Sequence, residues 1–365
     1  PAPNGYEDLY NLFRFIWPNQ DIIRFHLHHL REMSQNPFDS RVEKLIDNIS
    51  PFFIRIRKSD LGLPPPIERQ PIVISMGDRQ ERIYRFIEEK YISYFESKDR
   101  SSWVRDTLTR ARLIRLMQAS TNPGLLRSPL DLDESGEAVD AAIFVDDAEI
   151  LREVFEYERN EVPAKFREAI NLTTEILDQN ATNKVVLWCV FVQNLFALQE
   201  LLAKRGIDSR VLYGGTPTET DADAGQMETR ESIVNKFNRV DSDLRVVIAN
   251  PFAVGESISL HKACRHAIYV ERNFNGGAFL QSKDRIHRYG LPATAQVNYY
   301  YLTTFNSVDE TIHNRLLEKE ASMLRILESK TVPLIDMNVG TEEADSADDI
   351  SAIIRDYASR RANSR

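Results

Sequence analysis

The sequence predicts an α/β protein in which a mainly helical part comes first and a parallel sheet covered by helices on both faces follows. Up to about residue 127 the apolar residues recur mostly at helical spacing, whereas from residue 163 onwards short β-branched runs alternate with helical stretches. Strands that alternate with helices pair in parallel, because each helix carries the chain back across the sheet. We therefore expect a helical subdomain over residues 1–130, an acidic linker or insertion over 131–160, an α/β lobe over 161–330 and a tail over 331–365.

The helical part is predicted from apolar periodicity, and a turn-rich Pro-Pro-Pro stretch at residues 64–66 divides it. Proline lacks the amide hydrogen that a helix interior needs, so a helix is not expected to run through this stretch. The expected helices span Tyr6 to Phe15, Ile22 to Met33, Arg41 to Ile49, Asp78 to about Phe95, and Val104 to Gln118.

Charge distinguishes the linker and the tail from the rest of the chain. Between Asp131 and Glu149 there are eight acidic residues and no basic one, which indicates a surface linker or lobe insertion rather than a cluster of catalytic carboxylates. The tail is acidic from Gly340 and basic from Arg355 to Arg365. A frayed terminus with one amphipathic helix is the favoured interpretation of the tail, and a brace that binds a partner is the alternative.

The α/β lobe is predicted to open with a helix at Pro163 to Leu177, after which strands and helices alternate. The run from Arg245 to Ala249 is typical of its strands, because it is β-branched and is followed at once by the turn residues Asn250 and Pro251. Strands are expected at Val185–Phe191, Arg210–Tyr213, Arg245–Ala249, His266–Val270 and Gln296–Thr303, and helices at Leu195–Lys204, Arg230–Arg239, Gly277–His287 and Ser307–Glu328.

Composition excludes several classes of function. The net charge of −9 argues against a protein that coats nucleic acid non-specifically, so any nucleic-acid surface must be local. Cys189 and Cys264 have neither disulfide nor metal-site spacing. His26, His28 and His29 lie in a polar helical stretch without partnering cysteines. We therefore expect no metal site in the chain itself.

Residues 281–290, Gln-Ser-Lys-Asp-Arg-Ile-His-Arg-Tyr-Gly, hold the most informative pattern in the chain. On a helix Gln281, Arg285 and Arg288 stand at i, i+4 and i+7 and share one face. A guanidinium keeps its charge and offers a planar fork of donors, so two of them together suit the charge that develops on a transferred γ-phosphoryl group. The alternative is an exposed helix with scattered charges, in which Asp284 pairs with Arg288.

The spacing Q-x-x-D-R-x-H-R-x-G resembles the sixth conserved motif of superfamily 2 helicases, most closely that of the Swi/Snf-type remodelers and translocases. Other segments resemble further motifs of this family, in the family's order: residues 184–191 motif four, 213–216 its glycine turn, 230–238 its R-x-x-x-I-x-x-F helix, and 245–260 motif five. Motif five departs from the usual pattern G-x-G-x-N/T-L. Ser257 stands in place of the second glycine, Ser259 stands in place of the usual Asn or Thr, and Glu256 is an unusual residue at its position.

The first part of the chain resembles the Swi/Snf-type branch in particular. Residues 1–17 resemble the segment that follows motif three, and the blocks 49–61 and 63–68 resemble I-x-P-F-x-L-R-R-x-K-x-D-L and L-P-P-K-x-E. Residues 76–87 and 113–126 resemble the two helices that follow these blocks, although Asn122 replaces a histidine. Ordinary helicases lack these blocks, so the resemblance covers about 300 residues.

The resemblance implies a RecA-like second lobe, preceded by the helical insertion of the Swi/Snf type. It implies that Arg285 and Arg288 act as arginine fingers on ATP and that Gln281 orients the site. It also implies that two sets of loop residues bind ligands, namely Gly255, Glu256 and Ser257 on the nucleotide side, and Gly214, Gly215, Thr216 and Ser259 in a groove that tracks nucleic acid.

Neither a P-loop, G-x-x-x-x-G-K-[ST], nor an acidic strand end that would hold magnesium occurs in the sequence. We therefore expect ATP and Mg²⁺ to be bound mainly by an N-terminal RecA-like lobe of the same protein, and we expect the chain alone to be inactive. DNA, as a duplex, is the expected second partner, contacted through its backbone because a translocase must tolerate every sequence. Further protein partners stay open.

The expected function is therefore that of the C-terminal lobe of an ATP-dependent DNA translocase. Two alternatives stay open, a strand-separating DNA helicase and a non-hydrolysing module that docks nucleic acid or protein.

The longest apolar run, Val185 to Val192, is too short to cross a membrane. An intracellular protein is expected, cytoplasmic in a prokaryote or nuclear in a eukaryote.

Overall fold

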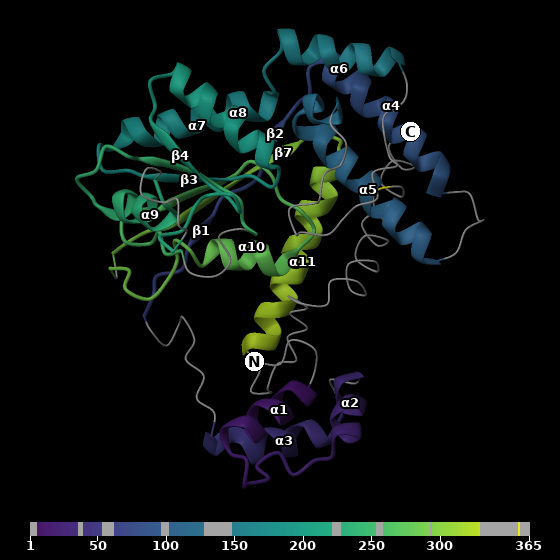
Figure 1. Ribbon diagram of the computed structural model, residues 1–365, viewed down its shortest axis with the longest axis vertical. Helices are drawn as coiled ribbons and strands as arrows, with labels where there is room; N and C mark the ends of the chain where they lie inside the picture. Colours follow the sequence, from purple (N-terminus) through teal and green to yellow (C-terminus); the bar gives the residue numbers. More distant parts are fainter. Residues whose placement is uncertain are drawn as a thin grey trace.

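The computed structural model describes residues 6–35, 39–52, 62–95, 102–127, 148–220, 228–252, 258–292, 294–328 and 357. These residues form a seven-stranded sheet with the strand order β1-β7-β6-β3-β5-β4, and β2 also pairs with β7. Each strand pair in the described part of the chain is parallel. Helices lie on both faces of the sheet (Figure 1), so the predicted α/β class is confirmed.

The strands are short, and the central ones are apolar along their whole length. Every residue of β3 and β5 is buried, as expected for strands that are covered on both faces. Val185 at the start of β3 lies opposite Val246 on one side and His266 on the other, so the three strands begin level with one another. The strands are β1 Ile67–Glu68, β2 Ile72–Ile74, β3 Val185–Trp188, β4 Ser209–Leu212, β5 Val246–Ala249, β6 His266–Tyr269 and β7 Asn298–Thr304.

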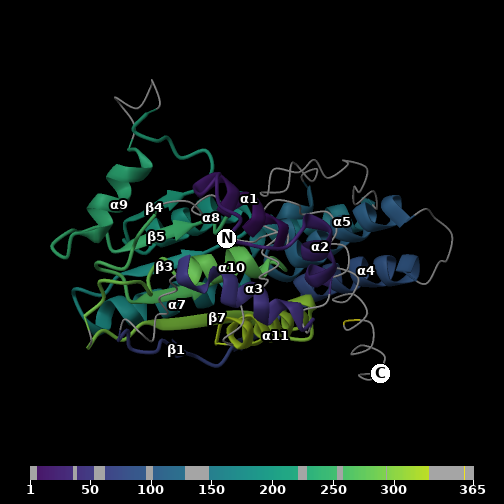
Figure 2. The same cartoon turned by 90° about the horizontal axis from the view of Figure 1, so that it is seen from below.

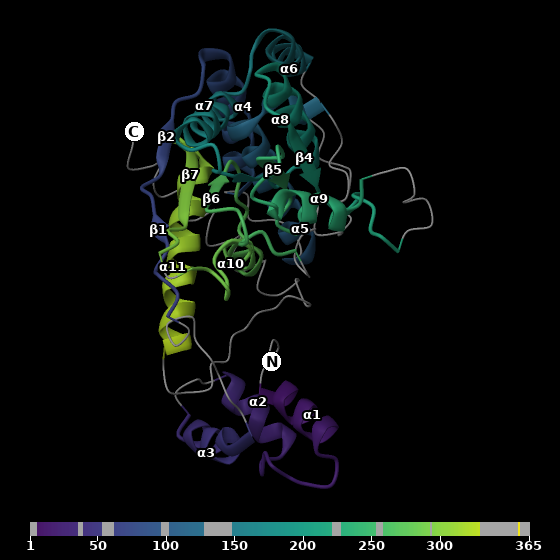
Figure 3. The same ribbon diagram turned by 90° about the vertical axis from the view of Figure 1, so that its left-hand side faces the viewer.

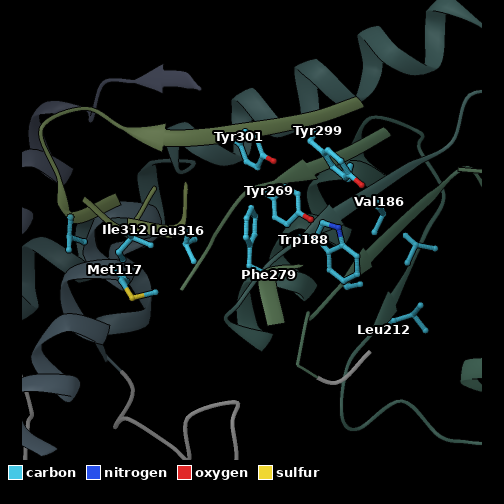
Figure 4. Packing of buried hydrophobic residues seen from close by; sticks show 14 of the residues in the cluster. Met117, Val186, Trp188, Leu212, Tyr269, Phe279, Tyr299, Tyr301, Ile312 and Leu316 are labelled. Carbon is cyan, nitrogen blue, oxygen red and sulfur yellow. The ribbon is translucent and has the colours of Figure 1, made fainter. Parts of the chain in front are cut away.

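Alternate residues of the strands enter two different hydrophobic cores. In β3, Val186 and Trp188 belong to the core that contains the aromatic side chains of β6 and β7, whereas Val185 and Leu187 belong to the core on the other face. Figure 4 shows Trp188 beside Tyr269 and Tyr299 in the first of these cores. This alternation follows from the twofold repeat of side-chain direction along a strand.

Five helices of the described chain flank the sheet in the α/β lobe. The second core contains residues of α7 and α8, and the first contains residues of α9, α10 and α11. None of the described helices, in this lobe or before it, combines the length and the apolar character that a membrane span needs. The five are α7 Ala164–Gln179, α8 Val192–Lys204, α9 Arg230–Asn238, α10 Gly276–Lys283 and α11 Val308–Glu328.

The earlier helices form two groups. The helices α1 Tyr6–Ile16, α2 Leu27–Gln35 and α3 Arg41–Ile49 share a core of their own and precede the short 3-10 helix η1 Ser50–Phe52. The second group comprises α4 Asp78–Phe95, α5 Ser102–Thr121, the 3-10 helix η3 Pro123–Arg127 and α6 Ala148–Asn160, and its apolar residues join the first core of the sheet. Figure 2 shows α4 and α5 side by side, at the end of the sheet away from α9. Within this group Gln80 donates to the carbonyl oxygen of Ser120 at 2.9 Å.

Residues outside the expected α/β lobe, 161–330, also join its sheet and its core. The strands β1 and β2 come from residues 1–130, and they pair with β7, which is the last strand in the sequence (Figure 3). The helix α6 occupies residues 148–160, where a linker or insertion was expected. In the expected tail, Tyr357 is buried and its hydroxyl lies 2.8 Å from that of Tyr84. The sheet and its core therefore include residues from both sides of the boundary expected at residue 130.

Candidate functional site

The helix α10 supports the first of the predicted site residues and then ends earlier than expected. Asn275 caps its N-terminus, where the side-chain oxygen accepts a hydrogen bond from the amide of Ala278 at 2.9 Å. The helix ends at Lys283, so Gln281 lies on it while Arg285 and Arg288 lie in the turn that follows. The prediction that all three share one helical face is wrong.

Two backbone features interrupt the helix in the turn after α10. The amide of Leu260 donates to the carbonyl oxygen of Arg285 at 2.9 Å, and Gly290 adopts φ +100°, which a helix does not contain. The residues from Asp284 to Gly290 are called the arginine turn below. Its two arginines are brought together by the fold of this turn and not by helical spacing.

Arg285 is the anchored member of the pair, and Arg288 is the exposed one. The guanidinium of Arg285 is half-buried and donates from Nη1 to the carbonyl oxygen of Ile258 at 3.3 Å. Burial lowers the pKa of Arg285, the nearby positive charge of Arg288 lowers it further, and Asp284 opposes both effects. The positive charge of Arg288 thus disfavours the charged form of Arg285, and a bound anion would offset this effect.

His261 lies within this concentration of positive charge, although the sequence did not single it out. Its Nδ1 lies 2.6 Å from the hydroxyl of Ser259, and a Cβ at Gly290 would lie only 3.2 Å from its Nε2. Burial lowers the pKa of His261, and the charges of Arg288, Arg265 and Lys262 lower it further. The segment 258–261, which includes Ser259, therefore packs directly against the arginine turn.

The second predicted set, Gly214 to Thr216, forms a turn after β4. Gly214 and Gly215 are exposed, and a Cβ at Gly215 would lie 2.7 Å from the ring of Tyr213, so a larger residue there would require this ring to shift. Thr216 is buried, and its hydroxyl accepts from the amide of Tyr213 at 3.0 Å and donates to the carbonyl oxygen of Val211 at 3.3 Å. The turn can therefore present the backbone of the two glycines to a ligand, while the side chain of Thr216 holds the turn together.

Not all the predicted residues can be placed or brought into contact. Gly255, Glu256 and Ser257 lie outside the described residues. Ser259 approaches the arginine turn through His261, and its carbonyl oxygen accepts from the side chain of Asn238 at 2.6 Å. The hydroxyl of Thr216 bonds within its own turn and to Val211, whereas the arginine turn contacts the segment 258–261, so the two predicted sets belong to different turns of the lobe.

The buried carboxylate of Glu271 was not predicted, and its contacts indicate a structural role. It accepts hydrogen bonds from the amides of Val190 and Phe191 at 2.8 and 2.9 Å and from the side chain of Asn194. Burial raises its pKa, and these donors oppose that rise. It joins the ends of β3 and β6 to the start of α8.

Among the described residues no group of three or more His, Cys, Asp or Glu side chains could hold a metal ion.

Comparisons with known proteins agree with the fold. No family model matches the sequence. The chain is 24% identical over 324 residues to a probable global transactivator of Orgyia pseudotsugata multicapsid polyhedrosis virus, a match that covers 86% of this chain and 57% of the viral protein. It is 28% identical over 149 residues to the human DNA repair and recombination protein RAD54B, which covers 41% of this chain and 15% of that protein.

A solved structure has the same fold. The C-terminal part of the Fun30 ATPase domain superposes with a TM-score of 0.51 at 20% sequence identity, covering 82% of this chain and 99% of that one. The RecA-like α/β fold and the resemblance to the C-terminal part of Swi/Snf-type ATPases are thereby confirmed. The chain spans little more than half the length of its viral relative.

Proposed function

We propose that this chain, which resembles the C-terminal part of Swi/Snf-type ATPases, supplies the second lobe and the helical insertion of an ATP-dependent DNA translocase. One observation supports the proposal most strongly. Arg285 is half-buried and bonded to the carbonyl oxygen of Ile258, while the exposed Arg288 is close enough to affect its pKa. Two cations that repel each other in the lobe alone are stabilised when an anion binds them.

The chemistry assigned to this pair is stabilisation of the charge that develops on the γ-phosphoryl group of ATP. Each guanidinium can donate two parallel hydrogen bonds to phosphate oxygens, and an arginine finger contributes about 10³-fold or more to the rate in phosphoryl transfer. Gln281, one turn before Arg285, orients the site. ATP and Mg²⁺ are held mainly by an N-terminal RecA-like lobe of the same protein, and the nucleotide loop 255–257 completes the site from this side.

Duplex DNA is the proposed substrate for movement, held through its phosphates. The exposed backbone of Gly214 and Gly215 suits this contact, because small residues let a phosphate approach the chain closely. Thr216 supports that turn, and Ser259, the other residue assigned to DNA, lies beside His261, whose ring is next to Gly290 of the arginine turn. Such a link would let binding of DNA and hydrolysis of ATP affect each other.

The test is DNA-stimulated phosphate release by the full-length protein carrying Arg285→Ala or Arg288→Ala. Each change should abolish turnover and leave the affinity for DNA within about twofold, because the phosphate backbone is bound elsewhere. Arg→Lys at either position should restore little, since an ammonium group lacks the planar fork. Arg205→Ala is the matched control, because Arg205 is an exposed arginine at the end of α8. Near-normal turnover in either alanine variant would rule out the finger assignment.

A further inference from the structure

The last residue of α10, Lys283, carries an almost completely buried ammonium group. Its side chain is only 8% exposed, and its Nζ lies 2.6 Å from Glu68 Oε1 and 2.5 Å from Glu320 Oε1. Glu68 belongs to β1 and Glu320 to α11, so three elements meet at this charge. Removing a charged group from water costs free energy unless it is paired, and two carboxylates pair this one.

Aromatic side chains fix the surroundings of Lys283. The ammonium lies 5.0 Å from the ring centre of Tyr299 and 5.4 Å from that of Phe279. The hydroxyl of Tyr299 donates to the carbonyl oxygen of Lys283 at 2.8 Å, and that of Tyr301 donates to Glu68 Oε2 at 2.5 Å. Figure 4 shows these rings packed together. The backbone and the side chain of Lys283 are therefore both held.

A second contact joins the same part of the chain to the other side of Arg285. The buried ring of His287 donates from Nε2 to the carbonyl oxygen of Pro64 at 2.8 Å. Pro64 lies four residues before Glu68 in the segment 63–68, which leads into and includes β1 and is called the strap below. The strap thus contacts Lys283, two residues before Arg285, and His287, two residues after it.

We propose that Lys283 and His287 are positioning residues for Arg285 and that the strap is the support against which they hold it. This inference rests on the proposed function. Arg285 is bonded on its other side by Ile258 and Leu260, so the strap and the segment 258–261 hold the arginine turn from two sides. A guanidinium stabilises a transition state only where its donors meet the developing charge, and a displacement of about 1 Å can cost about 100-fold in rate.

Another buried lysine of this lobe offers a matched control. Lys165 on α7 is 3% exposed and is paired with Asp309 on α11, so it resembles Lys283 in burial and pairing. Its side chain also bonds Thr121 at 3.0 Å, and its described contacts do not include the arginine turn. Loss of this pair should lower stability without affecting the position of Arg285.

The experiment measures the DNA-stimulated ATPase activity of the full-length protein carrying Lys283→Met, Glu68→Gln or Lys165→Met. Lys283→Met should lower kcat about 10- to 100-fold and Glu68→Gln several-fold, with KM for ATP within about twofold. Both should weaken binding of ADP with aluminium fluoride, a transition-state mimic, and leave binding of ADP unchanged. Lys165→Met should lower the unfolding temperature and leave kcat of the folded protein within about threefold.

Glu68→Gln keeps the test decisive if Lys283→Met does not fold, because the Glu68 side chain is 43% exposed and its neutralisation is mild. Unchanged kcat in Glu68→Gln together with unchanged kcat in any folded Lys283→Met would overturn the inference. An effect of Lys165→Met on kcat as large as that of Lys283→Met would also overturn it, because a general loss of stability would then explain both. If Arg285→Ala itself stays active, the proposed function fails instead.

Discussion

The backbone amide of Leu260 and the carbonyl oxygen of Arg285 form a hydrogen bond of 2.9 Å. Leu260 is completely buried, so the bond attaches the arginine turn to a fixed point of the core. Together with the close approach of Gly290 to His261 it places the turn against the segment 258–261. The position of the arginine turn is therefore fixed by the core of the lobe. The structure and the proposed function together support four predictions.

The isolated 365-residue chain should not hydrolyse ATP. Its sequence has the two arginines proposed to act on the γ-phosphoryl group but no P-loop and no strand-end carboxylate for magnesium. Phosphate release should stay at the buffer level with and without duplex DNA, at any concentration of the chain. Turnover that grows in proportion to the chain would reveal a complete site within it.

Gly290→Ala should destabilise the chain by about 1–3 kcal/mol, because alanine is strained at φ +100° and its Cβ would press on His261 at 3.2 Å. Gly206→Ala is the matched control, since Gly206 has φ +72° and nothing within 4 Å of the added Cβ. Thermal unfolding should show the larger decrease for Gly290→Ala. Adding His261→Ala should reverse part of it, and equal decreases for the two glycine variants would exclude a steric contribution from His261.

Stability should fall as the pH drops below about 6.5, and His313 should account for part of the fall. Burial lowers the pKa of His313 to about 3, and the charge of Arg272 contributes to this. An unfolded histidine has a pKa near 6.5, so the unfolded state takes up a proton first and the stabilising effect of neutral His313 disappears as the pH falls from about 6.5 towards 3. The unfolding temperature of His313→Gln should depend less on pH over this range. Parallel curves for the two proteins would contradict the assignment.

The full-length protein should move along duplex DNA without separating its strands and with little sequence preference. Displacement of a third strand from a triplex reports such movement, whereas release of a strand from a forked duplex reports unwinding. Binding should weaken steeply with salt, because released counterions drive phosphate contacts. Fork unwinding without triplex displacement would favour a strand-separating helicase, and activity in neither assay would favour a module that only docks nucleic acid or protein.

The sequence predicted the central strands well, because β3 and β5 are continuous apolar runs that only a doubly covered sheet accommodates. It missed β1, which has two residues and therefore shows no periodicity, and α6, whose residues follow an acidic stretch. Both join the fold through long-range packing that local composition does not reveal.

The geometry around the candidate site residues was predicted only in part, for a similar reason. The motif identified Gln281, Arg285 and Arg288, but their common helical face was inferred from spacing alone. The bond from Leu260 that helps to end the helix is not visible in that spacing. Lys283 lies inside the motif and was overlooked, because its partner Glu68 is 215 positions earlier, a separation that follows from their numbering. The available signal was that Lys283 shares a face of the expected helix 277–287 with the apolar residues Phe279 and Ile286.

The strand pairing on the outer side of β7 determines where the chain can be cut to give a stable fragment. The first residues of β7 pair with β1 and its last residues pair with β2. Two strands from the first 75 residues of the chain therefore cover the outer edge of β7, which is formed by residues 298–304. An uncovered strand edge is a template for pairing with other chains. A fragment cut at residue 130 would expose this edge, together with core residues that α4 and α5 normally cover. Such a fragment should aggregate, whereas one that begins before residue 63 would keep its edge closed.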